Sequence, residues 1–590
     1  MAASRRGQPE LQVRLPSTQN LPISELPPIS ALFLIDFDVK AGYTISWKAS
    51  KPGVELEGVV EYKSLPSGLH TVSEDLIYFV HDGFAGLSAF VNAPVEDTEV
   101  RNARMLAVGV LVPLSYGRLG RAWKHAEELK TMASKFATST KDIAALEEYW
   151  QKHQAREGSV APAETVESPS ITFHPPPKQP QGHVRNRSAS DAAALLPPGH
   201  RLSAYHPAWS LMKFLDTFGP LIFPIYRAAL LRKRILISCH APVQEACNFV
   251  YDISILSNIP QPIFDLLSPS SPPHRLRPLF SIGVHDIPFL VEDSKPRRNN
   301  DEPSDNDQEA GTGWVACTTD SILAKKDALW DVLVTLPPPH SSNAKRHVWP
   351  KIEGPQGVPI RASQRDLRRF RSLKAGLSRL PPQSSPGASP TPPRNSPDND
   401  PFLDEAEEKE VVEPLSWTAL AYNGFMWWAS AGEQARTEIA EESARDAELL
   451  ADIDASPSSS SMRMEVPPLS ASIASLRPAD PDEARAELAL IAYFHRLTTQ
   501  VLGTLADVVE SDEDDANDEE DDDGAAALVG DDDGEDGRGV RVSSEDIGRM
   551  GLDVWSAADA AFVTAAVEAY FGRRAYVEGK GLEVCGVRVC

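Results

Sequence analysis

The sequence is poor in cysteine, in basic charge and in long apolar runs, and each shortage excludes a class of protein. Only 5 cysteines occur among 590 residues, too few and too scattered for a disulfide framework, so we expect free thiols in a reducing compartment. The longest apolar stretch, 214–231, contains Asp216, Pro220 and Arg227 and is too short to cross a bilayer. The N-terminal residues lack the apolar core of a secretory signal. These absences predict a cytoplasmic protein, at most peripheral on intracellular membranes.

Basic residues are outnumbered by acidic ones, 58 against 84, which gives a net charge of −26. The run from Glu510 to Asp536 holds 16 acidic residues and no lysine or arginine, so the remainder of the chain carries only −10. Neither part shows the basic face by which nucleic-acid binders attract phosphates. We therefore expect no nucleic-acid partner.

Proline, in contrast, is abundant at 50 residues and clusters with serine and acidic residues. Such segments bury too little apolar surface to offset the entropy of ordering the chain. We predict disorder over 1–27, 155–200 and 338–411, and in an acidic insertion at about 507–541. The predicted folded blocks are then 28–154, 201–337 and 412–590.

The apolar pattern indicates an α/β protein. In 28–154, five strand-like runs precede helical periodicity, which is typical of an antiparallel sheet covered by helices. In 201–337, strands alternate with helices, which favours an α/β layer with parallel pairing. The block 412–590 is mostly helical by periodicity and ends in short strand-like pieces.

No pattern builds an active site. Asp36 and Asp38 share one face of a strand, which is more typical of a solvated strand tip than of an acid/base pair. Cys239 and His240 are adjacent on a strand and face opposite sides, so we interpret them as a buried thiol beside a surface histidine. The glycines around Lys580 lack the spacing of a phosphate-binding loop, and the histidines lack metal-binding spacing. We assign no catalytic, cofactor-binding or metal-ligating residue.

Aromatic residues gather in the helix-like segment 415–430. They are Trp417, Tyr422, Phe425, Trp427 and Trp428. Their helical spacing favours burial in a core, and a contact patch for a partner is the alternative.

Regulatory patterns lie in the segments predicted to be disordered. Ser188 and Ser190 stand beside arginines, as basophilic kinases require, and four further hydroxyl residues precede proline: Ser385, Ser389, Thr391 and Ser396. We predict a phosphoprotein, in which each added phosphate would change the local charge.

Long stretches of the chain follow a familiar order. The runs at 58–79, 84–92 and 101–130, followed by those at 206–257, 278–290 and 313–337, resemble the LCHN-type DENN-domain proteins, a family of eukaryotic trafficking factors. The block 412–590 resembles the extra C-terminal domain that fungal members carry.

The resemblance implies a longin-like module over 28–154, a central DENN α/β module over 201–337, and a mostly helical C-terminal domain. It implies guanine-nucleotide exchange on a Rab-type small GTPase in membrane trafficking, with the GTPase docked between the longin and DENN modules. Such exchange requires no cofactor and no acid/base residue, and exchange is the only enzymatic activity that we expect. The alternative is a non-catalytic Rab-binding adaptor or scaffold on intracellular membranes. The family has no short signature from which the GTPase-binding surface could be assigned.

Overall fold

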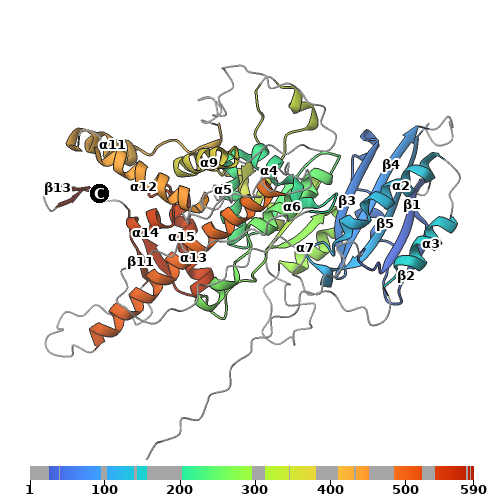
Figure 1. Cartoon of the computed structure of the whole chain (residues 1–590), viewed down its shortest axis with the longest axis horizontal. Coiled ribbons are helices and arrows are strands. Elements are labelled where there is room, and N and C mark those ends of the chain that lie inside the picture. Colours follow the sequence, from blue (N-terminus) through green and yellow to red (C-terminus); the bar gives the residue numbers. More distant parts are fainter. Residues whose placement is uncertain are drawn as a thin grey trace, which may run out of the picture.

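The computed structural model shows an elongated molecule with a β-rich lobe at one end and a helical block at the other (Figure 1). It describes residues 26–38, 40, 42–94, 103–138, 143–155, 202–294, 313–344, 346–379, 410–430, 433–450, 484–520, 539–579, 582–584 and 587–589. Among these residues, no helix is both long and apolar enough to cross a membrane. The six predicted phosphorylation sites, Ser188, Ser190, Ser385, Ser389, Thr391 and Ser396, lie outside this part of the chain.

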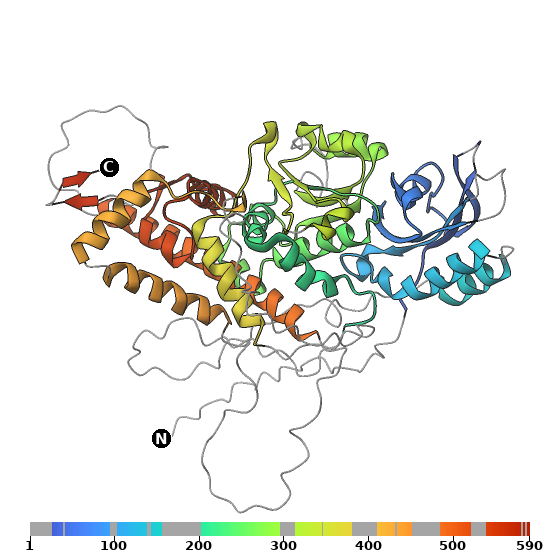
Figure 2. The ribbon, with the colours of Figure 1, turned by 90° about the horizontal axis from the view of Figure 1, so that it is seen from above.

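The N-terminal lobe is the antiparallel sheet that the five apolar runs predict. Its strands are β1 (Ala31–Asp38), β2 (Gly42–Ser50), β3 (Glu74–His81), β4 (Phe84–Pro94) and β5 (Ala103–Pro113). Residues 31–35 are buried on both faces of β1, because helices cover the sheet on both sides. Figure 2 shows the short α1 (Val60–Ser64) on one face, and α2 (Ala126–Thr138) and α3 (Ile143–His153) on the other.

The second lobe is an α/β layer, as its alternating pattern predicts. The strands β6 (Ile235–Ser238), β7 (Arg277–Ser281), β8 (Trp314–Thr318) and β9 (Val332–Thr335) pair in parallel. Their side chains alternate between two cores, so that Ile235 and Ile237 enter the main core while Leu236 enters a smaller one on the opposite face. The main-core face is covered by α4 (Leu211–Phe218), α5 (Ile222–Leu230) and α6 (Gln244–Leu256), and the smaller core by α7 (Ile287–Asp293) and α8 (Ser321–Ala324).

The two lobes share one sheet of ten strands in the order β10-β9-β6-β8-β7-β3-β4-β5-β1-β2. The joint is a single antiparallel pair, Phe79 of β3 with Phe280 of β7. Because a single pair supplies few backbone hydrogen bonds, side chains must fix how the lobes sit against each other.

The prediction of a disordered linker over 338–411 is wrong for much of its length. β10 (Lys351–Glu353) adds an antiparallel edge strand to β9, and α9 (Gln364–Leu377) is a packed helix. The helix begins with a capping box, in which Ser363 accepts from the backbone of Asp366 and Asp366 accepts from that of Ser363. Leu367, Phe370, Leu373 and Leu377 form its buried face. Proline-rich stretches on either side dominate the composition of the window and conceal this helical period.

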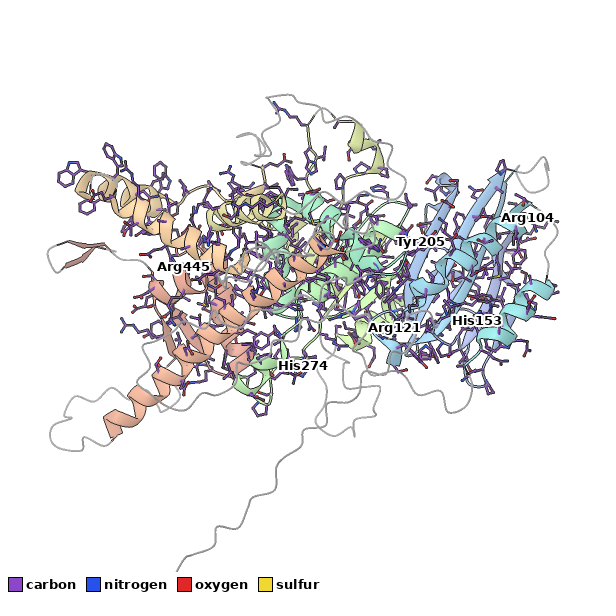
Figure 3. All side chains as sticks on the ribbon, in the orientation of Figure 1. Arg104, Arg121, His153, Tyr205, His274 and Arg445 are labelled. Atoms are coloured by element: carbon purple, nitrogen blue, oxygen red, sulfur yellow. The ribbon has the colours of Figure 1, made fainter. Side chains whose placement is uncertain are left out.

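The C-terminal block is mostly helical, as predicted. It comprises α11 (Trp417–Ser430), α12 (Glu433–Leu450), α13 (Arg485–Glu520), α14 (Ser544–Arg549), α15 (Ala557–Phe571), and the short strands β11 (Val540–Val542), β12 (Ala575–Val577), β13 (Leu582–Val584) and β14 (Val587–Val589). Arg445 of α12, labelled in Figure 3, donates to the carbonyl of Gly548 at 3.0 Å and ties α12 to α14.

The prediction of a disordered insertion at about 507–541 is wrong for its first part, because α13 continues through Glu520. Val508 and Val509 are buried on this helix, and Asp512 pairs with Arg573 at 2.9 Å. These contacts hold the first part of the acidic run in the helix.

The C-terminal block packs directly on the second lobe. α13 lies along α4 and α6 (Figure 1), and Thr498 hydrogen-bonds Tyr226 of α5 at 2.7 Å. His495 bonds the carbonyl of Ile255 in α6 at 3.2 Å, and the Tyr570 hydroxyl donates to the carbonyl of Leu230. One continuous hydrophobic core therefore includes both regions.

Candidate functional site

The seam between the two lobes is held by charged and polar side chains. Asp75 of β3 extends from the N-terminal lobe to the start of α6, where its carboxylate accepts from the backbone amides of Val243 at 2.7 Å and Gln244 at 3.1 Å. Burial raises the pKa of Asp75, against the effect of these amides. A carboxylate at a helix N-terminus complements the helix dipole and satisfies amides that have no partner within the helix. One lobe thus caps a helix of the other.

A second contact joins α1 to the turn before α7. The Lys63 ammonium and the Asp286 carboxylate form an ion pair at 2.7 Å, with both side chains largely buried. Lys63 also donates to the carbonyl of Val80 at 2.8 Å, and Asp286 accepts from the amide of Gly283 at 2.9 Å. Because both charges have additional hydrogen bonds, their burial is compensated.

A third contact lies beside the second. The Ser67 hydroxyl donates to Asp320 at 2.5 Å, and the other oxygen of the same carboxylate accepts from the amide of Val284 at 3.1 Å. The Tyr62 ring stacks on the His285 ring with centroids 3.9 Å apart. Residues from α1, from the turn before α7 and from the turn before α8 therefore meet at one place.

The first turn of the second lobe adds a fourth contact on α2. Tyr205, labelled in Figure 3, donates from its hydroxyl to Glu127 at 2.6 Å. The ammonium of Lys130 lies over the same ring, 5.8 Å from its centroid. The second lobe is thus attached to the first at both α1 and α2, and these contacts fix the orientation of one lobe relative to the other.

Large apolar side chains stand exposed on the segments that meet at this seam. They are Tyr62 of α1, Phe289 and Val291 of α7, and Ile322 of α8, each between 43% and 54% exposed. Single exposed apolar residues are ordinary, but a group of them on neighbouring segments is typical of an interaction site. We call Tyr62, Phe289, Val291 and Ile322 the seam patch.

The residues that the sequence singled out lie elsewhere. Asp36 and Asp38 belong to β1, which is separated from the seam by β3, β4 and β5, and Asp38 accepts from the amide of Lys40 at the β1–β2 turn. Cys239 is buried and His240 is exposed, as predicted. Lys580 lies outside the described residues.

The prediction that the tryptophans of α11 belong to a core is wrong. Trp417, Trp427 and Trp428 are largely exposed, whereas Ala419 and Tyr422 of this helix are buried. Their spacing does place the three indoles on one helical face, but that face is turned to solvent.

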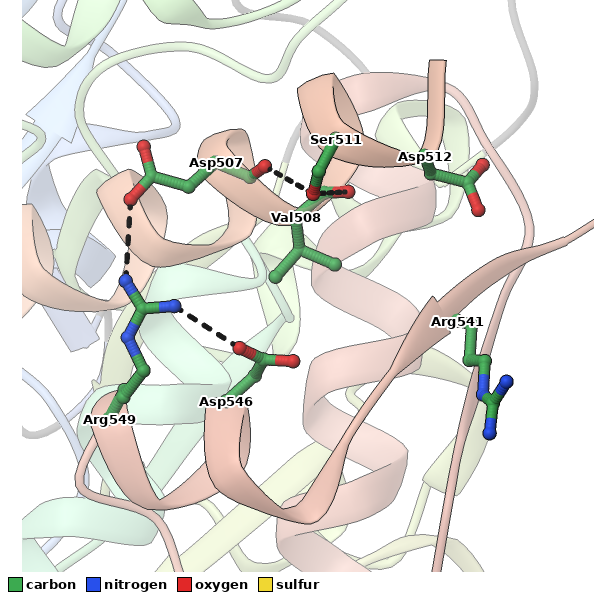
Figure 4. Close-up of a pocket in the computed structure, with 7 residues that line it drawn as sticks. All are labelled: Asp507, Val508, Ser511, Asp512, Arg541, Asp546 and Arg549. Atoms are coloured by element: carbon green, nitrogen blue, oxygen red, sulfur yellow. Dashed lines mark hydrogen bonds and ion pairs between the residues drawn. The ribbon is translucent and has the colours of Figure 1, made fainter. Parts of the chain in front are cut away.

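Figure 4 shows a pocket in the C-terminal block that carries several charges. It is lined by Asp507, Val508, Ser511, Asp512, Arg541, Asp546 and Arg549. Arg549 pairs with Asp546 at 3.3 Å and with Asp507 at 3.6 Å, and Arg541 pairs with Glu578 at 2.5 Å. Because both cations are neutralised within the protein, the pocket is a weaker candidate than the seam.

Sequence reasoning did not find the seam residues. Asp75 and Val243 are 168 positions apart, and Ser67 and Asp320 are 253 apart. No local spacing signals such pairs, and Asp75, Ser67 and Asp320 taken alone look like ordinary polar surface residues. The only available signal was the resemblance, which implies a functional surface between the modules without naming its residues.

The antiparallel lobe and the α/β lobe, joined in one ten-stranded sheet, agree with the fold of a DENN module. The sequence model described as DENN domain-containing protein 11 matches residues 32–346, and the chain belongs to this family. A second model, described as a domain of unknown function, matches residues 412–590.

Curated relatives agree with this assignment. DENN domain-containing protein 11 of Xenopus laevis is 32% identical over 342 residues, which cover 57% of this chain and 65% of the relative. That of Rattus norvegicus is 31% identical over 326 residues, covering 54% and 59%. The chain thus spans less than two thirds of the length of these relatives. The uncharacterized protein ANR2 of Saccharomyces cerevisiae is 24% identical over 515 residues, covering 83% of this chain and 84% of the relative.

Proposed function

We propose that this protein is a guanine-nucleotide exchange factor for a Rab-type small GTPase, and that the GTPase docks on the seam patch. The observation that carries the proposal is the position of the patch, because Tyr62 belongs to one lobe while Phe289, Val291 and Ile322 belong to the other. A GTPase seated there would contact both lobes. Membership of the DENN domain-containing protein 11 family supports this reading.

Exchange of this kind needs a rigid surface rather than a reactive group. The exchanger accelerates nucleotide release by binding the nucleotide-free GTPase more tightly than the loaded form. The Asp75 cap on α6 and the Lys63–Asp286 pair hold the two lobes in one relative orientation. A surface that is already ordered loses little entropy on docking, so more of its contact energy remains to favour the nucleotide-free state.

The test uses the full chain and a panel of Rab GTPases loaded with fluorescent GDP. We expect faster GDP release from at least one Rab. Phe289→Ala should reduce that acceleration at least tenfold, because an aromatic anchor buried in an interface often contributes about 2 kcal/mol or more to the binding free energy. Tyr576→Ala is the matched control, since Tyr576 is similarly exposed but lies on β12 in the C-terminal block.

Two results would count against the proposal. Unchanged release across the whole panel would reject exchange activity. Binding that prefers the GTP-loaded Rab, without faster release, would instead identify an adaptor that holds the active GTPase.

A further inference from the structure

Ser511 lies on α13 at the point where the acidic run of the chain begins. Its side chain is exposed, and its hydroxyl donates to the backbone carbonyls of Asp507 at 2.8 Å and Val508 at 3.1 Å. Both acceptors belong to the same helix, and Ser511 lines the open, charged pocket of the C-terminal block (Figure 4). An enzyme that approaches from solvent can therefore reach this hydroxyl.

The residues after Ser511 form a pattern that acidophilic protein kinases recognise. Asp512 follows the serine directly, and the next three residues are also acidic. Kinases of this class select a serine by carboxylates at the first and third positions after it, because basic residues around their active site bind these charges. Asp512 and Asp514 occupy both positions, and no lysine or arginine follows before Arg538.

The end of α13 can unwind with little loss of stability, which a kinase requires because it binds its substrate as an extended chain. Residues 513–520 include six acidic residues and no basic one. Negative charge at the C-terminal end of a helix is unfavourable to the helix dipole. Like charges four positions apart, such as Asp514 and Asp518, also repel each other in a helix. The chain after Ser511 is therefore well suited to open onto a kinase.

A second serine that precedes acidic residues is less suitable. Ser543 has Glu545 and Asp546 at the second and third positions after it. It begins α14, where its hydroxyl accepts from the amide of Asp546 and donates to the carboxylate of the same residue at 2.6 Å. A kinase would first have to break this capping box, so Ser511 is the favoured position.

We propose that Ser511 is phosphorylated by an acidophilic serine kinase that uses MgATP. The Ser511 oxygen forms a bond to the γ-phosphorus of ATP while the bond from that phosphorus to the β-phosphate oxygen breaks. The hydroxyl proton passes to a base of the kinase, and ADP leaves. The product carries up to about two negative charges at neutral pH. The proposal concerns the C-terminal block and does not depend on exchange activity.

The added phosphate would enter a pocket in which carboxylates outnumber guanidinium groups. The charged residues that line it are Asp507, Asp512, Asp546, Arg541 and Arg549. Both arginines already pair with carboxylates, and the phosphorylated oxygen no longer donates to the two helix carbonyls. A phosphate beside carboxylates near the C-terminal end of a helix disrupts that end. Phosphorylation therefore loosens α13 around Ser511 and weakens the pairs of Arg549 with Asp507 and of Arg573 with Asp512.

The test incubates the full chain with MgATP and an acidophilic kinase of the casein-kinase type, and locates the phosphate by mass spectrometry of proteolytic fragments. We expect phosphate at Ser511 and none at this position in Ser511→Ala. Asp514→Asn keeps the serine but removes the charge at the third position, so it should slow phosphorylation at least tenfold. Glu519→Gln is the matched control, since it removes one charge outside the recognised positions and should leave the rate unchanged.

Hydrogen–deuterium exchange then measures the effect of the phosphate on α13. We expect the amides of 507–512 to exchange at least tenfold faster in the phosphorylated chain, while those of 490–500 keep their rate. The difference should shrink when salt rises from about 50 to about 300 mM, because exposed charges are screened. Ser511→Ala loses the same two hydrogen bonds without gaining charge, so it should exchange like the unmodified wild type.

Three outcomes would overturn the proposal. Phosphate on Ser543 or another serine, with Ser511 unmodified, would place the site elsewhere. Equal rates of phosphorylation for the wild type and Asp514→Asn would show that the acidic positions do not direct the kinase. Slower exchange of 507–512 after phosphorylation would show that Arg541 and Arg549 bind the phosphate and tighten the helix, which is the reverse of the proposed effect.

Discussion

Arg227 lies buried between two carboxylates that belong to different parts of the fold. Its guanidinium donates to both oxygens of Asp366 on α9, at 2.8 and 2.7 Å, and its nitrogen Nη2 is 3.2 Å from Asp559 on α15. Burial raises the pKa of Asp559 to about 7, although Arg227 opposes this change. Burial also acts to raise the pKa of Asp366. The charge and hydrogen bonds of Arg227 outweigh this effect, so the pKa of Asp366 is lowered. Folding therefore shifts the pKa values of these two carboxyl groups in opposite directions.

Asp559 should make the stability of the protein depend on pH. Its pKa is raised from 3.8 to about 7 on folding, so between these values the folded chain binds a proton that the unfolded chain does not. Stability conferred by this group is present at low pH and falls as pH rises toward 7. In Asp559→Asn this contribution is absent. We therefore expect the difference in melting temperature, variant minus wild type, to increase by a few degrees between pH 5 and pH 8. Thermal unfolding of both proteins at each pH measures this difference.

Other groups around the cluster titrate as well, and the comparison of two chains separates them. Glu413 before α11 has a raised pKa because of its burial, and Asp553 donates its backbone amide to Asp559 at 2.8 Å. These residues are present in both chains, so their direct effects largely cancel in the difference. Parallel melting curves for the two proteins across this pH range would contradict the assignment to Asp559.

At the scale of elements, α9 depends on the same cluster. Asp366 closes the capping box of this helix and pairs with Arg227, so Asp366→Ala removes a cap and leaves a buried guanidinium with one carboxylate fewer. Breaking a buried pair costs about 3–5 kcal/mol. Because Asp559 remains beside Arg227, we expect a loss near the lower end of that range in the free energy of unfolding, measured by urea titration.

A neighbouring ion pair on the same helix provides the control. Arg368 pairs with Glu442 at 2.9 Å, but its side chain is 43% exposed, and pairs of this kind contribute less than about 1 kcal/mol. Arg368→Ala should therefore change stability little. An equally small loss of unfolding free energy for Asp366→Ala and Arg368→Ala would mean that α9 is stabilised by its apolar face alone.

Some elements could be predicted from the sequence because their signal is local. Residues 31–35 and 235–237 are short apolar runs, and in the structure each is a buried strand. α9 was missed because proline-rich neighbours mask its period. α11 was placed in the core because periodicity shows which residues share a face but not what covers that face. The seam could not be predicted, because Asp75 and Val243 meet only through the fold.

At the scale of the whole molecule, the two sequence-model matches do not correspond to two independent bodies. Residues 32–346 and 412–590 are matched separately, yet Phe494 of α13 packs on Phe223 and Tyr226 of α5 with ring centroids 5.8 and 5.1 Å apart. These residues belong to one hydrophobic core. The C-terminal block therefore completes the second lobe rather than standing as an appendage.

A chain truncated after residue 409 should consequently fail to fold normally. It would lose α13 and α15, and with them the cover over α4, α5 and α6. Exposing apolar surface costs about 25 cal/mol per Å². The free-energy cost of exposing the core faces of several helices is therefore comparable to the whole free energy of unfolding of an ordinary domain. We expect aggregation in gel filtration, strong binding of a hydrophobic dye, and loss of the near-ultraviolet circular dichroism signal that fixed aromatic side chains produce.

Deletion of residues 521–538, which lie between α13 and β11, gives the matched comparison. That chain should keep the melting temperature and spectrum of the full protein, which would show that shortening by itself is harmless. A monomeric chain ending at 409 with a sharp thermal transition would contradict the shared core, and would mean that the second lobe folds without α13. Because Phe223 and Tyr226 of α5 pack on Phe494 of α13, they would lose this cover without α13, and the loss of folding is the expected result.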